Sequence, residues 1–215
     1  MSFNPYQMNG GSIVGISGND FSIIASDTRL CQQDSYLIHS RTNPHVHKMS
    51  DKLFLGAVGF NGDVLTLVKM LKNHVRTYNY KFQKNMSANA FAAMLSVTLY
   101  SRRFFPLYVQ NILAGVDEEG KGVVYSYDPV GSYEKYQYRA AGSSGAILQP
   151  FLDNRIGGKN LKNGVPDLTA EEGLQIVKDV FISAAERDIH CGDNVVIKVI
   201  KKDGVKEFVF PLRRD

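Results

Sequence analysis

The sequence contains no tryptophan and only two cysteines, Cys31 and Cys191, which lie far apart in the chain. They form neither a CxxC pair nor a cysteine and histidine spacing typical of zinc sites, so a small disulfide-stapled domain is excluded. Two reduced thiols are the simplest interpretation, and reduced thiols are typical of the cytoplasm and nucleus. We therefore expect the protein in those two compartments.

Long apolar runs are also missing. The longest stretch without a charged residue in the body of the chain is Asn85–Ser101, and several asparagine, serine and threonine residues interrupt it. It is too short and too polar to span a bilayer. The first residues, MSFNPYQMNGG, lack the basic and apolar segments of a secretory signal. The sequence thus predicts a soluble intracellular protein without a membrane partner.

Neither sign of charge dominates the chain. Its 25 basic and 21 acidic residues give a formal net charge of +4. This excess is too small and too scattered to indicate a nucleic-acid partner. The length of 215 residues and the hydrophobic content of 44% are sufficient for one large domain with its own core.

Strand-like segments come in pairs along the chain. Ser12–Ser17 and Phe21–Ser26 are rich in isoleucine and valine and flank a Gly-Asn-Asp turn, which predicts a hairpin. The other expected strands are Leu53–Val58, Asn111–Val116, Val123–Tyr127, a segment near Tyr136–Ala140, Val195–Ile200 and Val205–Phe210.

Two pairs of helices separate these strands. Asp63 and Ser87 are expected to cap the first pair, and Pro106 to stop it. In the second pair, Ser143–Asp153 contains Pro150, which should kink or shorten the helix, and Thr169 begins a capping box with Glu172. The polar, glycine-rich segment Asn154–Pro166 is expected to be a surface loop between them.

The order of strands, two helices, strands, two helices and strands predicts an α+β fold. Because hairpins dominate, we expect two antiparallel sheets flanked by helical pairs, a four-layer α-β-β-α sandwich. Residues 1–10 are expected to be an N-terminal extension and residues 11–215 a single domain, since no linker or internal repeat is visible.

Two common kinds of binding site find little support. The glycine-rich segment 11–18 lacks the spacing of a dinucleotide-binding loop, no strand precedes it, and no Walker sequence is present. His39, His45 and His47 lie close in sequence, but no third ligand is placed beside His45 and His47 on their shared strand face.

A dispersed set of polar segments is more informative. Asp27 ends a strand, Gly142-Ser143-Ser144-Gly145 opens a helix, and Arg187-Asp188 closes the last long helix. Together they resemble the beta-type subunits of the 20S proteasome, of the N-terminal-nucleophile hydrolase superfamily. The resemblance covers nearly the whole chain and is strongest in GGSIVGISG (10–18), ASDTR (25–29), DPVGSYE (128–134), AAGSSGAILQPFLD (140–153) and AAERDIHCGD (184–193).

The resemblance implies a mechanism that this sequence lacks the means to perform. In active members, cleavage after a glycine exposes an N-terminal threonine that attacks the peptide bond, helped by a lysine and an aspartate. The threonine position falls on Gly11, the lysine position on His45 if the intervening segment is two residues longer, and the last serine position on Cys191. The positions that match are Asp27, Ser143 and Asp188.

Without the nucleophile we expect no enzymatic activity in this chain itself, because its loss typically lowers turnover about a millionfold. The resemblance then implies a structural subunit of a 28-subunit particle that serves ATP- and ubiquitin-dependent protein degradation. Its partners would be neighbours in a seven-membered beta ring, the opposing beta ring and the adjacent alpha ring. No cofactor is required, although backbone carbonyls of Ala185, Asp188 and Cys191 are candidates to hold a structural Mg²⁺.

Two alternatives remain at this point. Cleavage before Ser12 would make an active N-terminal-serine hydrolase, but a one-residue shift turns the side chain to the opposite strand face, away from Asp27 and His45. The other alternative is a free-standing adaptor that belongs to no ring.

Overall fold

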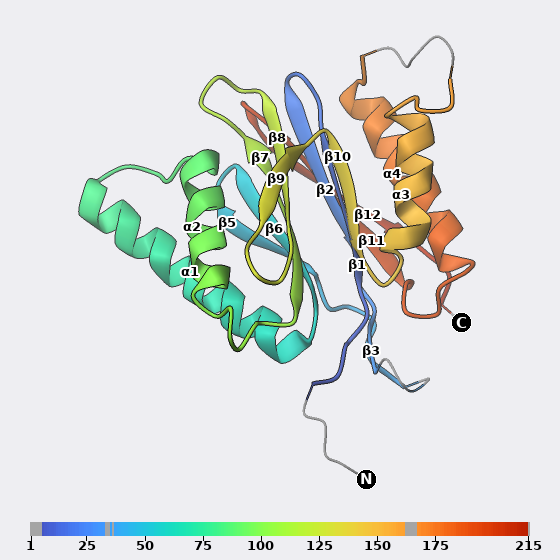
Figure 1. Ribbon diagram of the computed structural model, residues 1–215. Helices are drawn as coiled ribbons and strands as arrows, with labels where there is room; N and C mark the ends of the chain where they lie inside the picture. The colour runs from blue at the N-terminus through green and yellow to red at the C-terminus, as the bar shows by residue number, and fades with distance from the viewer. Residues whose placement is uncertain (1–5, 33–34, 36, 162–166, 215) are drawn as a thin grey trace.

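The computed structural model describes residues 6–32, 35, 37–161 and 167–214. Two five-stranded antiparallel sheets face each other, and each carries two helices on its outer face (Figure 1). This arrangement confirms the predicted four-layer α-β-β-α sandwich.

The first sheet has the strand order β10-β1-β2-β11-β12. The predicted hairpin forms its centre, where Ile16 pairs with Ile23 and Val14 with Ala25. Its strands are β1 (Ser12–Ser17), β2 (Phe21–Asp27), β10 (Tyr138–Gly142), β11 (Asn194–Lys201) and β12 (Gly204–Pro211).

The second sheet has the order β5-β6-β7-β8-β9, and a short ladder joins β3 to β4. The expected single segment near Tyr136–Ala140 is wrong, because the chain crosses from the second sheet to the first at Gln137. The remaining strands are β3 (Leu30–Cys31), β4 (Ile38–Ser40), β5 (Val46–Ser50), β6 (Leu53–Gly59), β7 (Val109–Val116), β8 (Gly122–Tyr127) and β9 (Tyr133–Tyr136).

Four helices complete the layers. Ser87 and Thr169 cap their helices as predicted, the latter with a complete capping box. Asp63 does not cap, because its helix begins two residues earlier and its carboxylate instead accepts a hydrogen bond from the Tyr108 amide. The third helix continues through Pro150 and includes Asn154 and Arg155 of the predicted loop. Residues 156–161 of that loop form neither helix nor strand, as predicted, and residues 162–166 lie outside the described residues. The helices are α1 (Asn61–Phe82), α2 (Ala88–Tyr100), α3 (Gly145–Arg155) and α4 (Ala170–Ala185).

Three apolar layers hold the sandwich together: one under α1 and α2, one between the sheets, and one under α3 and α4. Strand β1 contributes to two of them, since Ile13 faces the second sheet while Val14 and Ile16 face α3 and α4. Residues 11 and 12 therefore point to opposite sides of the first sheet. Among the described residues, no helix is long and apolar enough to cross a membrane.

Candidate functional site

The site begins where the chain enters β1. Gly10 and Gly11 have φ angles of +72° and +85°, a region that side chains disfavour. A Cβ atom on residue 11 would lie 2.8 Å from Nε2 of His45 and 3.0 Å from Cγ1 of Val58. Residue 11 thus has neither a nucleophilic side chain nor free space for one.

Asp27 ends β2 and is completely buried behind Gly11. Its Oδ1 accepts a hydrogen bond from the Ser12 amide at 2.8 Å, and its Oδ2 accepts one from the Gly192 amide at 3.3 Å. Burial raises the pKa of Asp27 to about 8, although these backbone hydrogen bonds work in the opposite direction. At neutral pH the carboxyl group is therefore mostly protonated.

His45 lies just before β5 and is also buried. Its Nε2 is 3.0 Å from the carbonyl oxygen of Arg29. Because a carbonyl only accepts, we assign the proton to Nε2. Burial lowers the pKa of His45, so the ring is neutral at pH 7. Its Nε2 lies 3.9 Å from Oδ1 of Asp27, and this pair carries little charge where active members have a lysine and an aspartate.

A chain of hydroxyl groups occupies the other side of β1. The Ser12 Oγ accepts a hydrogen bond from the Ser144 amide at 3.0 Å and lies 3.1 Å from the Oγ of Ser143. The Ser144 hydroxyl donates to Oδ2 of Asp188 at 2.6 Å. Cys191 is buried beside them, and burial raises the pKa of its thiol. The network leaves the Ser12 hydroxyl inaccessible to solvent.

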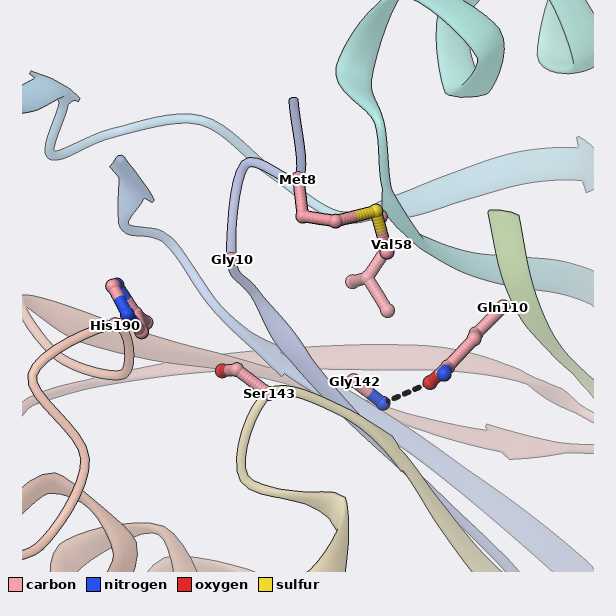
Figure 2. A pocket seen from close by; sticks show the side chains of 8 residues that line it. Met8, Gly10, Val58, Gln110, Gly142, Ser143 and His190 are labelled. Atoms are coloured by element: carbon pink, nitrogen blue, oxygen red, sulfur yellow. Dashed lines mark hydrogen bonds between the residues drawn. The ribbon is translucent and has the colours of Figure 1, made fainter. Parts of the chain in front are cut away.

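An open cleft of about 200 Å³ lies next to Gly11. Figure 2 shows Met8 and Val58 on one side of it, His190 on the opposite side, and Gln110 bonded to the Gly142 amide at its floor. Ser143, Gly10 and Gly59 complete the lining. The Nδ1 atom of His190 lies 3.1 Å from the sulfur of Cys31. Burial is the main reason that the pKa of the Cys31 thiol is raised to about 11.

The structure brings together all six residues that the sequence singled out: Gly11, Asp27, His45, Ser143, Asp188 and Cys191. His39 is exposed on β4, and no cluster of three metal-binding side chains occurs among the described residues. The sequence did not single out three residues that contribute to the site: Asn9, Ser144 and His190. Ser144 and His190 did carry a signal, because each stands beside a predicted site residue, Ser143 or Cys191.

The three carbonyl groups considered for a cation lie at the end of α4, where Ala185 is the last helical residue, and in the turn that follows, which contains Asp188 and Cys191. Carbonyls at a helix C-terminus lack intrahelical partners and carry partial negative charge, which suits a hard cation. One of the three, that of Asp188, accepts a hydrogen bond from the Cys191 amide at 3.1 Å and keeps a second lone pair. The donor chemistry is therefore compatible with Mg²⁺.

Two facing antiparallel sheets between helical pairs, with a site at the start of the first strand, define the sandwich fold of the N-terminal-nucleophile hydrolases. Comparison with protein families narrows this class. The family model described as "Proteasome subunit" matches residues 8–200, so the chain belongs to the proteasome subunit family.

Several similar proteins are beta subunits. Proteasome subunit beta type-1 of Danio rerio is 53% identical over 215 residues, covering 99% of this chain and 90% of the relative. The beta type-1 subunit of Drosophila melanogaster is 50% identical over 99% of this chain and 91% of its own length. Proteasome subunit beta type-6 of Saccharomyces cerevisiae is 44% identical over 99% and 92%. Within the family, the segments FNPY (3–6), NGG (9–11), RRFFP (102–106) and DPVGSYE (128–134) resemble the sixth beta subunit of the eukaryotic ring.

Proposed function

We propose that this chain is a non-catalytic, structural beta subunit of the 20S proteasome core particle. It builds the beta ring and the wall of the proteolytic chamber, while other beta subunits supply the threonine nucleophiles. The particle would be the 28-subunit assembly of four rings that acts in ATP- and ubiquitin-dependent degradation, in the cytoplasm and nucleus.

One observation carries the proposal: residue 11 is a glycine, and His45 fills the space that a side chain there would need. The positions that would help a nucleophile to transfer its proton are also changed. Asp27 and His45 occupy them, and both are buried and largely uncharged at neutral pH. A chain with this site contributes surface rather than chemistry. Its neighbours in the seven-membered beta ring, the opposing beta ring and the alpha ring are the partners that this role requires.

The remaining parts of the proposal follow from the family. Residues 11–215 form the subunit domain and residues 1–10 an N-terminal extension that stays attached, because self-cleavage before residue 11 needs a hydroxyl that glycine lacks. No cofactor is required. A structural Mg²⁺ on the carbonyls of Ala185, Asp188 and Cys191 would only fix the turn after α4.

The alternative, an N-terminal-serine hydrolase exposed by cleavage before Ser12, is disfavoured by the position of that side chain. The Ser12 hydroxyl is buried and bonded on the side of Ser143 and Ser144, whereas His45 lies against Gly11 on the opposite face. Asp27 does contact residue 12, but it accepts a hydrogen bond from the backbone amide, and this bond does not involve the Ser12 hydroxyl.

A single purification tests these possibilities. The tagged full-length chain is recovered from its own cells under native conditions, sized, and treated with an electrophilic threonine-protease inhibitor before mass spectrometry. We expect a particle of several hundred kilodaltons, labelled on other subunits only, with an intact mass for this chain that includes residues before Gly11. A labelled chain beginning at Ser12 would establish the alternative, and an unaccompanied monomer would establish the adaptor.

A further inference from the structure

Asn9, two residues before the degenerate nucleophile position, uses all of its polar groups in hydrogen bonds. Its backbone N–H donates to the Gly59 carbonyl at 2.9 Å, and its backbone carbonyl accepts from the Cys31 amide at 3.1 Å. Its side-chain Nδ2 donates to the Cys31 carbonyl at 3.2 Å, and its Oδ1 accepts from the Asn61 amide at 2.8 Å. One residue thus joins β3, β6 and the start of α1.

The bond to Asn61 supplies something that α1 lacks. The residue at the N-cap position of this helix is Phe60, which has no side chain capable of capping. The first amides of a helix have no intrahelical partner and require one from elsewhere. Asn9 therefore acts as the cap of α1 from a position 52 residues earlier in the sequence.

The bonds to Cys31 reach the opposite side of the cleft. Cys31 belongs to β3, which pairs with β4 in a separate short ladder, whereas Gly59 and Asn61 belong to the second sheet and its helix. Nearby, the ring of Tyr6 lies 5.8 Å from that of Phe60 and 4.9 Å from that of Tyr108, which adds an aromatic contact on the same side as α1.

We propose that residues 6–10 form an internal strap in which Asn9 is the positioning residue that ties β3 to the second sheet and to α1 beside the cleft. Met8 and Gly10 of the strap line the cleft directly, and Figure 2 shows the strap running past His190 into β1. The strap is then part of the folded subunit rather than a dispensable extension. This inference needs only the folded chain, and it stands whether or not the chain is catalytically silent.

Residue-resolved hydrogen exchange on the full-length chain, in the assembly with which it is purified, tests the strap. Asn9→Ala should accelerate exchange of the Asn61 amide roughly 2- to 30-fold, the range expected for losing an N-cap side chain. The Cys31 amide should accelerate as well, because the strap loosens as a unit. Gln7→Ala is the matched control, because Gln7 also carries a side-chain amide within the strap but has no described hydrogen bond. This variant should leave the exchange of the Asn61 and Cys31 backbone amides unchanged.

Two further variants separate a strap from an ordinary cap. Asn9→Asp keeps an acceptor for the Asn61 amide, and a carboxylate suits a helix N-terminus, so protection of that amide should persist. Asn61→Pro removes the donor at a helix position that tolerates proline and leaves Asn9 and Cys31 in place. The strap predicts faster exchange at Cys31 even in Asn61→Pro. Unchanged Cys31 exchange in that variant, or an Asn9→Ala chain that behaves like Gln7→Ala, would overturn the inference.

Discussion

Replacing Gly11 with alanine tests whether the structure leaves room for any side chain at residue 11. The new methyl group would be placed on a residue with φ of +85° and only 2.8 Å from Nε2 of His45. Neither neighbour yields readily, because His45 is held by the Arg29 carbonyl and Val58 belongs to the layer between the sheets. The variant should therefore suffer both backbone strain and overpacking.

Each contribution has a known scale. A left-handed conformation costs a residue with a side chain about 1–2 kcal/mol, and overpacking a filled interior costs about 1–3 kcal/mol. We expect Gly11→Ala to lower the free energy of unfolding by the sum, about 2–5 kcal/mol. For a chain of this size, each kcal/mol corresponds to a fall of about 2–4 °C in melting temperature.

A double-mutant cycle with His45→Ala separates the two contributions. His45→Ala alone leaves a cavity and an unpaired buried carbonyl and should cost about 1–3 kcal/mol. In the double variant the methyl group has room beside residue 45. The double variant should therefore lose about 1–3 kcal/mol less stability than the sum of the losses in the two single variants. Gly120→Ala is the control for strain alone, since Gly120 has φ of +92° but faces only the flexible side chain of Lys202.

The assay is thermal unfolding of the four full-length variants beside the unmodified chain. Gly120→Ala should lose only the part due to backbone strain, and Gly11→Ala clearly more. Additive losses in the cycle would show that His45 does not close the site, and a Gly11→Ala chain as stable as the unmodified one would refute the steric argument altogether.

Three other predictions concern buried or capping polar groups. Between pH 4 and 8 the folded chain holds a proton on Asp27 that the unfolded chain releases, so stability should fall through this group as pH rises; Asp27→Asn should flatten that slope in unfolding measured against pH. Asp193 pairs with the buried Arg29 at 2.9 Å, and Asp193→Ala should lower the free energy of unfolding by about 3–5 kcal/mol, measured by urea denaturation; a loss under 1 kcal/mol would contradict a buried pair. Thr169→Ala breaks the capping box with Glu172 and should cost about 1 kcal/mol in the same assay, with faster amide exchange confined to the first turn of α4.

Elements with a strong local pattern could be predicted from the sequence. The β1–β2 hairpin has two apolar runs around a turn, and α4 has both a capping box and an apolar face, so local chemistry and tertiary packing agree. Strands β3 and β4 were missed because they are short. A strand around His45 and His47 was considered, but no bounds were predicted for β5, in which a register shift between Lys48 and Ser50 interrupts the alternation.

Errors at element boundaries have a common cause. Asp63 has the right chemistry for a cap, but the Asn61 amide already has a partner in Asn9, so α1 begins earlier. Similarly, nothing local marks Gln137 as the point where the chain changes sheets. Both features depend on contacts between residues far apart in sequence, which a local pattern does not contain.

The site illustrates the same limit. The resemblance located Gly11, Asp27 and Asp188, but the position of His45 depended on an assumed two-residue difference in the segment before it. The structure places His45 directly against Gly11 and near Asp27. No spacing rule could have predicted that its ring fills the volume beside residue 11.

The polar residues around Gly11 have a structural role that does not depend on a nucleophile at residue 11. Asp27 accepts the amides of Ser12 and Gly192, and Ser144 links Ser12 to Asp188, so these groups satisfy one another inside the protein. Replacing any one of them with an apolar residue would leave a buried donor or acceptor unpaired, at a cost of about 1–3 kcal/mol. The threonine position is different, because no hydrogen bond depends on a side chain there. These hydrogen bonds therefore do not require a side chain at residue 11, whereas each of the polar side chains around it contributes to the stability of the fold.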